Sequence, residues 1–176
     1  DPHALRPGYY TRARYIRLGG SPDEIVGPGD EGELIIATDS DTMFTEYLGR
    51  PDATAEKMRD GWYYTGDVIT VDERGYFTLC GRADDMVKSG GENIHPGEIE
   101  DVLGAAPGVK DCCVIGLPDD HWGQVVVGCV VAGDGDVDAA ALDAHFKASA
   151  IAGFKRPKGY FVTAEIPRNP GNGNVL

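Results

Sequence analysis

The sequence predicts an α+β protein with a β-rich first part and a mixed second part that join near residue 85. Up to residue 80 the apolar residues follow strand patterns, whereas after residue 85 helical and strand-like patterns alternate. The join reads GRADDMVKSGGENIHPGEI, residues 81–99, and has too little apolar periodicity for an amphipathic helix. Its charged residues are too many to be buried without partners. We therefore interpret this stretch as a functional connection.

In the first part, two strand patterns flank one short helix. The apolar run GELIIAT at Gly32–Thr38 predicts a strand that is buried on both faces. VITVDERGYFTLC, residues 68–80, alternates apolar and polar residues on both sides of a glycine-containing turn and so predicts a hairpin. Between them, Pro51 is suited to the first turn of a helix, which we expect to be ended by Asp60-Gly61.

The second part predicts a sheet that is covered by helices on one side. Its elements are expected in the order helix, strand, strand, helix, strand. The first helix opens at Pro96, carries apolar residues at helical spacing and ends at Gly104 or Gly108. We expect strands at residues 111–117, 124–132 and 160–165 and a helix at residues 138–149.

Composition excludes several classes of function. The formal charge of −13 over 176 residues would repel nucleic acid and an anionic membrane surface. The sequence has neither an 18-residue apolar run nor an apolar signal core at its start, so we expect no membrane partner and a cytoplasmic location. No histidine pair has metal-ligand spacing, so no metal site is expected. The four cysteines, which we expect to be reduced core thiols, are Cys80, Cys112, Cys113 and Cys129.

Four motifs carry a family resemblance. GWYYTGDV at 61–68 resembles the YxTGD motif of the adenylate-forming enzymes, the superfamily of acyl-CoA synthetases, luciferases and peptide-synthetase adenylation domains. GRADDMVKSGGENIHPGEIE at 81–100 resembles the GRxDDxxKxxGxxIxxxEIE motif of the same family. FKRPK at 154–158 and IPRNP at 166–170 follow in family order. Through SGGENIHP, HWGQ and FKRPK, the sequence is most similar to the bacterial 4-chlorobenzoate and related aryl-CoA ligases.

The resemblance implies a two-step ligase with two domains. Residues 1–83 would be the β-rich end of a large adenylation domain, and residues 84–176 a small mobile C-terminal domain with its hinge near Asp84. ATP and a small-molecule carboxylate would give an acyl-adenylate, from which the CoA thiol displaces AMP. Mg²⁺ is expected through ATP alone. The remainder of the N-terminal domain is an expected partner, and a homodimer is left open.

The nucleotide would be bound by the first part. The resemblance implies that Asp67 accepts hydrogen bonds from both ribose hydroxyls, since one carboxylate offers two acceptor oxygens. A turn aspartate that caps Gly66 is the alternative for this residue. Arg82 would approach the ribose or the phosphates, with a surface ion pair to Asp84 or Glu100 as its alternative. Asp84 itself is either the hinge or an ordinary linker residue.

CoA would be bound by the second part. Glycines without a Cβ let the backbone approach the pantetheine arm closely, although they also suit a simple turn. Aromatic rings can stack on adenine while a guanidinium binds phosphate, although isolated aromatic residues are more often core. A lone acid such as Glu92 either orients the thiol region or is simply solvated. The implied CoA-binding residues are Lys88, Ser89, Gly90, Gly91, Glu92, Trp122, Phe154 and Arg156.

The sequence departs from the family pattern at Asn174. The family has a lysine here that neutralises charge during adenylation, and this sequence has one extra residue and an amide instead. The family's phosphate loop and acyl pocket lie upstream of the motifs found here, so we expect a segment of a larger enzyme and assign no catalytic residue. The alternatives are a non-catalytic module that binds CoA or nucleotide and an inactive truncated product.

Overall fold

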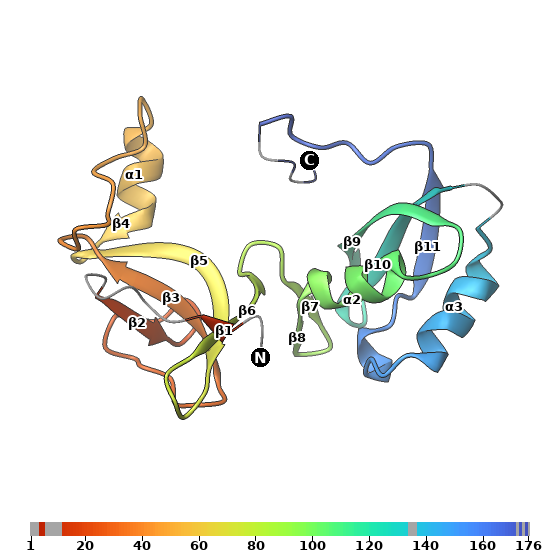
Figure 1. Cartoon of the computed structure of the whole chain (residues 1–176), viewed down its shortest axis with the longest axis horizontal. Helices are drawn as coiled ribbons and strands as arrows, with labels where there is room; N and C mark the ends of the chain where they lie inside the picture. The colour runs from red at the N-terminus through yellow and green to blue at the C-terminus, as the bar shows by residue number, and fades with distance from the viewer. Residues whose placement is uncertain (1–3, 6–11, 134–136, 172, 174, 176) are drawn as a thin grey trace. The chain divides into compact units, whose positions relative to one another are not determined.

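The chain folds into two compact units, Asp1–Asp84 and Asp85–Leu176, each with its own sheet (Figure 1). The computed structural model describes residues 4–5, 12–133, 137–171, 173 and 175. Strands outweigh helices in both units, so the expected α+β fold class is confirmed. Within these described residues no helix is long and apolar enough to cross a membrane, and no three His, Cys, Asp or Glu side chains converge as metal ligands.

The first unit is built on an antiparallel sheet, which among the described residues has the order β1-β6-β5-β3-β2, with β4 beside β5. The long strand β5 lies at its centre and pairs with β3, β4 and β6. The elements are β1 Ala4–Leu5, β2 Ala13–Ile16, β3 Glu31–Ala37, α1 Pro51–Lys57, β4 Met58–Arg59, β5 Trp62–Val71 and β6 Phe77–Arg82.

Three expectations for the first unit need correction. The strand expected at Gly32–Thr38 is present as β3, but it is not buried equally on both faces, because its residues alternate between buried and half-buried from Glu33 onward. Helix α1 ends at Lys57, earlier than expected, because the chain turns into β4 there. Asp60 and Gly61, with φ of 53° and 77°, instead form the tight turn between β4 and β5. Strands β2 and β4 were not expected.

The second unit has a mixed sheet around β10. In the described part of this unit, β10 pairs antiparallel with β9 and β7 and parallel with β11, while β8 pairs with β7. The elements are β7 Val87–Ser89, β8 Glu92–Ile94, α2 Pro96–Gly104, β9 Val109–Asp119, β10 Gly123–Ala132, α3 Ala139–Ala148, the short 3₁₀ turn η1 Gly153–Lys155 and β11 Gly159–Thr163.

One core cluster explains the placement of the helices. Ile99 and Leu103 of α2 and Leu142 and Phe146 of α3 are buried in the same cluster as side chains from β7 to β10. Both helices therefore cover one face of the sheet, as expected. Burying each such side chain contributes about 1.5–3 kcal/mol. Of the four free cysteines, only Cys113 is buried and the other three are half-buried, so the expectation of core thiols holds for one of them.

The hairpin β7–β8 corrects our interpretation of residues 81–99. We excluded an amphipathic helix and left a simple turn at Gly90-Gly91 open, but expected no strands, whereas Val87–Ser89 and Glu92–Ile94 pair antiparallel across that turn. Both glycines have positive φ, 61° and 88°, which is what a two-residue hairpin turn of type I′ requires. The signal was present in the sequence as a Gly-Gly pair, but the flanking strands are only three residues long and show no clear alternation.

Candidate functional site

In the first unit, Asp67 and Arg82 form an ion pair. They stand opposite each other on β5 and β6, and Arg82 Nη1 donates to Asp67 Oδ1 at 2.6 Å. Both side chains are partly exposed, Asp67 by 33% and Arg82 by 45%. A Cβ at Gly66, whose φ is 75°, would lie 2.9 Å from Arg82 Nη2. The glycine of the TGD motif therefore makes room for the guanidinium as well as providing the turn.

The turn around Asp67 is held by side chains that the sequence did not single out. Thr65 Oγ1 accepts from the Asp67 backbone N at 2.9 Å and donates to Leu34 O at 2.7 Å. The buried Glu33 accepts from the Gly66 backbone N at 3.2 Å. Asp67 thus lies within β5 and does not cap Gly66, which contradicts that alternative. A buried acid in an apolar strand, such as Glu33, was the one signal that could have revealed this support.

Asp84 lies at the end of the first unit, close to two cations. Its Oδ2 is 3.6 Å from Lys57 Nζ and 4.0 Å from Arg82 Nη2, and its side chain is 69% exposed. Arg82 therefore lies between two acids, with Asp67 as the nearer partner. The preceding residue, Ala83, is tied to its own unit because its backbone N donates to Gly66 O at 2.7 Å. Glu100, the other partner considered for Arg82, accepts from the Val114 backbone N at 2.8 Å.

In the second unit, the Gly90-Gly91 turn packs against Trp122. The Gly90 backbone N donates to Trp122 O at 2.9 Å, and Ser89 stands opposite Gly123. A Cβ at Gly90 would lie only 2.7 Å from Cε3 of the indole, whose residue is 47% exposed. The structure therefore brings together four of the sequence-predicted CoA residues, which are Lys88, Ser89, Gly90 and Trp122. Glu92 begins β8 directly after the turn and is exposed.

The position of Trp122 is fixed by the loop between β9 and β10. Asp119 Oδ1 accepts from the backbone N of His121 at 2.9 Å and of Trp122 at 2.8 Å. These two bonds hold the pKa of the Asp119 carboxyl below its usual value. The His121 ring meets the indole edge to face, with centroids 4.6 Å apart. Trp122 is nevertheless 47% exposed, as a side chain that stacks on a ligand must be.

Gly90→Ala is expected to destabilise the second unit and to move the Trp122 ring. The new Cβ would collide with the indole, and φ of 61° alone costs roughly 1 kcal/mol for an alanine. Urea unfolding and tryptophan fluorescence measure the two effects. Gly91→Ala is the matched control, because Gly91 has φ of 88° but nothing within 4 Å of its Cβ position. Equal fluorescence shifts in both variants would argue against the ring contact.

Phe154 and Arg156 lie on and after η1. Phe154 is 48% exposed, and Lys155 Nζ lies 5.8 Å from the centroid of its ring. Lys155 also donates to Glu98 Oε1 at 2.6 Å, so its charge is already neutralised by the first turn of α2. Within the described residues, Arg156 Nε is buried without a hydrogen-bond partner. No hydrogen bond or ring contact between described residues joins Phe154 or Arg156 to Trp122.

Asn174 lies outside the described residues. Its neighbour Gly173 accepts from Arg168 Nη1 at 3.2 Å, and Arg168 Nη2 donates to Asp111 Oδ1 at 2.8 Å. This guanidinium thus connects Gly173 to the start of β9.

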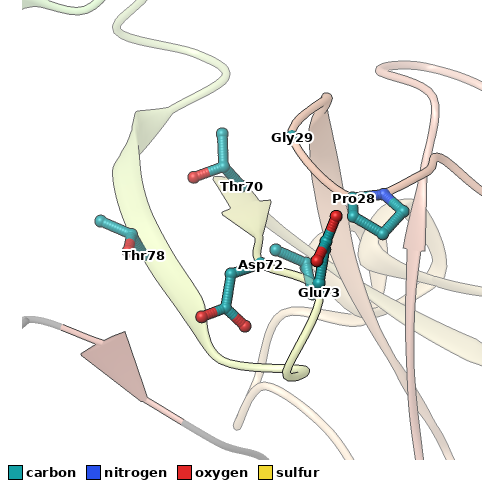
Figure 2. Close-up of a pocket in the computed structure, with 7 residues that line it drawn as sticks. Pro28, Gly29, Thr70, Asp72, Glu73 and Thr78 are labelled. Atoms are coloured by element: carbon teal, nitrogen blue, oxygen red, sulfur yellow. The ribbon is translucent and has the colours of Figure 1, made fainter.

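A hollow of about 430 Å³ in the first unit is lined by none of the residues that the sequence predicts for nucleotide or CoA binding. Figure 2 shows its lining beside the β5–β6 turn, with two threonines, two acids and the Pro28-Gly29 corner. Asp72 Oδ1 is used by the turn itself, because it accepts from the backbone N of Arg74 and Tyr76. The hollow therefore follows from the shape of the hairpin turn.

Part of the chain matches a known domain family. Residues 98–172 match the AMP-binding enzyme C-terminal domain family. The match covers most of the second unit. The resemblance that the motifs carried is thereby confirmed, and the matched AMP-binding enzyme domain includes Trp122, Phe154 and Arg156.

Two relatives of this chain are named as enzymes that form CoA thioesters of acids. The chain is 45% identical over 165 residues to a 4-chlorobenzoate–CoA ligase from Arthrobacter sp, with 94% of the chain and 31% of the relative covered. It is 43% identical over 171 residues to a feruloyl-CoA synthase from Amycolatopsis sp, with 97% and 33% covered. The chain therefore spans about a third of the length of these curated relatives.

Solved structures of CoA synthetases and of MatB resemble the chain. An o-succinylbenzoate CoA synthetase from Bacillus subtilis, in complex with its acyl-adenylate intermediate, aligns with a TM-score of 0.83 and 29% identity over 97% of this chain and 33% of that one. MatB from Rhodopseudomonas palustris, with ATP bound, aligns with a TM-score of 0.80 and 32% identity over 98% and 34%. The fold of the chain is thus shared with parts of proteins whose structures hold an acyl-adenylate or ATP.

Proposed function

We propose that the chain is the C-terminal third of an AMP-forming acid–CoA ligase. The observation that carries the proposal is the 45% identity to a 4-chlorobenzoate–CoA ligase over 94% of the chain. Two clusters of side chains support it, one around Asp67 in the first unit and one around Trp122 in the second. An aryl carboxylate is the proposed substrate class, because the relatives named for 4-chlorobenzoate and ferulate both act on aryl acids.

In the first step, a carboxylate oxygen attacks the α-phosphorus of ATP, and pyrophosphate leaves. The remainder of the N-terminal domain supplies the phosphate loop and the acyl pocket. Asp67 accepts from the ribose hydroxyls through the oxygen that Arg82 leaves open, and Arg82 holds the carboxylate in place at 2.6 Å. Mg²⁺ is brought by ATP, as a counterion to its phosphates.

In the second step, the CoA sulfur attacks the acyl carbon, and AMP leaves with its phosphate. The pantetheine arm passes along Lys88, Ser89 and the Gly90-Gly91 turn on the side of Gly91, where nothing lies within 4 Å of the Cβ position. The half-open indole of Trp122 and the exposed ring of Phe154 offer stacking faces to adenine. Arg156, whose Nε is buried without a partner among the described residues, supplies donors for the CoA phosphates.

The second domain alternates between the two steps about Asp84. Ala83 is fixed to the first unit by its bond to Gly66, and the compact units divide directly after Asp84. Asp84 is therefore the first residue at which the backbone is free to change φ and ψ. Its carboxylate, near Lys57 and Arg82, retains contacts within the first unit while the chain beyond it moves.

Arg156→Ala is expected to weaken CoA binding by roughly 10- to 100-fold, because hydrogen bonds to charged groups contribute about 1.5–3 kcal/mol. Isothermal titration of the chain with CoA measures the change. Lys110→Ala is the control, since it removes one cation at an exposed position of the same unit. An equal loss in both variants would mean that net charge, and not a contact made by Arg156, explains the weaker binding. A wild-type chain that binds neither CoA nor AMP would contradict the proposed function.

A further inference from the structure

The β7–β8 hairpin contacts β10 through one paired position and two flanking hydrogen bonds. Ser89 stands opposite Gly123, and this is the single register position between β7 and β10 in the described chain. One residue later, the Gly90 N donates to Trp122 O at 2.9 Å. One residue earlier, the Lys88 backbone N donates to the side-chain Oε1 of Gln124 at 2.8 Å. A side-chain carbonyl thus continues the contact where the backbone ladder has ended.

A glycine on β9 leaves the space that the Gln124 side chain occupies. A Cβ at Gly116 would lie 3.1 Å from Gln124 Nε2 and 3.0 Å from Val87 Cγ1. Gly116 therefore leaves the space in which the Gln124 amide and the buried Val87 side chain pack. The assignment of the amide is chemically determined, because the Lys88 N–H requires an acceptor and only the carbonyl oxygen of Gln124 is one.

We propose that Gln124 is a positioning residue of the CoA site. It holds the β7–β8 turn against the Trp122 indole by accepting the Lys88 N–H, so that the backbone beside the pantetheine path and the stacking face keep a fixed spacing. This role rests on the proposed function for its consequence in CoA binding. The contact itself is independent of the proposed function, because the distances above establish it.

Without the acceptor, the turn loses one of its few attachments. Lys88 N would have to bond to water, and the turn end of the hairpin would remain paired with β10 through Ser89 and Gly90, while Val87 and Ile94 stay packed in the core. A hairpin of two three-residue strands is not stable by itself. The turn would therefore open more often, and CoA would bind to a smaller fraction of molecules, which reduces its apparent affinity by that fraction.

Two variants of Gln124 separate the hydrogen bond from the size of the side chain. Gln124→Leu keeps a similar volume but has no acceptor, whereas Gln124→Glu keeps an acceptor oxygen for the Lys88 N–H. Amide hydrogen exchange of Lys88, followed by NMR in the whole chain, reports the contact directly. Gln124→Leu should accelerate exchange at Lys88 and weaken CoA binding, each by about tenfold. Gln124→Glu should keep slow exchange and retain CoA affinity within about threefold.

A third variant tests the same contact without changing Gln124. Gly116→Ala should displace the Gln124 amide and accelerate Lys88 exchange in the same direction. Unchanged exchange at Lys88 in Gln124→Leu would overturn the proposal, as would faster exchange with an unchanged affinity for CoA. If the wild-type chain binds no CoA while Lys88 exchange responds as expected, the proposed function is contradicted and Gln124 is still supported as the residue that holds the turn.

Discussion

Replacing Asn174 by lysine, with the extra residue of the terminal segment deleted, should raise the adenylation rate of the complete ligase by about 10²–10³-fold. Negative charge gathers on the α-phosphate and carboxylate oxygens as the adenylate forms. An amide can donate a hydrogen bond to this charge but cannot neutralise it, whereas an ammonium group does both. The gain corresponds to roughly 3–4 kcal/mol of transition-state stabilisation.

The two half-reactions must be measured separately to test this effect. Pyrophosphate exchange follows adenylation, and thioester formation from a supplied aryl-adenylate follows the second step. Only the first should respond to the lysine, since the terminal segment is proposed to leave the site before CoA attacks. Asn174→Gln serves as the control, because it lengthens the side chain without adding charge. Full adenylation activity with Asn174 in place would refute the prediction.

Asp84→Pro should slow one half-reaction of the complete ligase by about tenfold or more relative to the other, a difference of roughly 1.4 kcal/mol in barrier. Proline fixes φ near −65° and also restricts the residue before it, here Ala83. Because Ala83 is already bonded to Gly66, the restriction at Asp84 would fall on the backbone at the boundary between the two units. The domain would then favour one of its two arrangements.

Asp84→Ala separates the hinge from the ion pairs. It removes the carboxylate that lies 3.6 Å from Lys57 and 4.0 Å from Arg82, but it leaves the backbone free. The exposed pairs are each worth 1 kcal/mol or less, so a small and equal effect on both steps is expected. Equal slowing of both half-reactions in Asp84→Pro would argue against a hinge at this residue. Rapid-quench measurements of each step provide the comparison.

Elements with strong apolar periodicity could be predicted from the sequence. Strand β3 starts and ends within one residue of its expected bounds, and α2 begins at the expected Pro96. The β5–β6 hairpin was visible because apolar and polar residues alternate on both sides of its glycine-containing turn. Short elements gave no such signal, since β4 and β7 have two and three residues and their pairing is decided by contacts distant in sequence.

The candidate site was predictable only as far as its motifs extend. The motifs identified Asp67 and Trp122 as candidate site residues, but they did not identify the residues that support the site. Glu33 supports the Asp67 turn from a strand that reads as apolar, and Gln124 reaches Lys88 from 36 positions along the chain. Such contacts depend on strand register, and a one-residue shift would turn each of these side chains to the opposite face. The sequence alone leaves that register open.

Because of the contact between Gly90 and the Trp122 ring, the residues that position 90 tolerates depend on the residue at position 122. Glycine is required at position 90 for two separate reasons, the left-handed backbone and the closeness of the indole. Loss of the ring would remove the second reason but not the first, so asparagine or aspartate, which tolerate a left-handed φ, would then become acceptable there. Gain of the ring would close that option again. In this chain, asparagine at position 90 is therefore expected to be tolerated only when the Trp122 ring has been removed first.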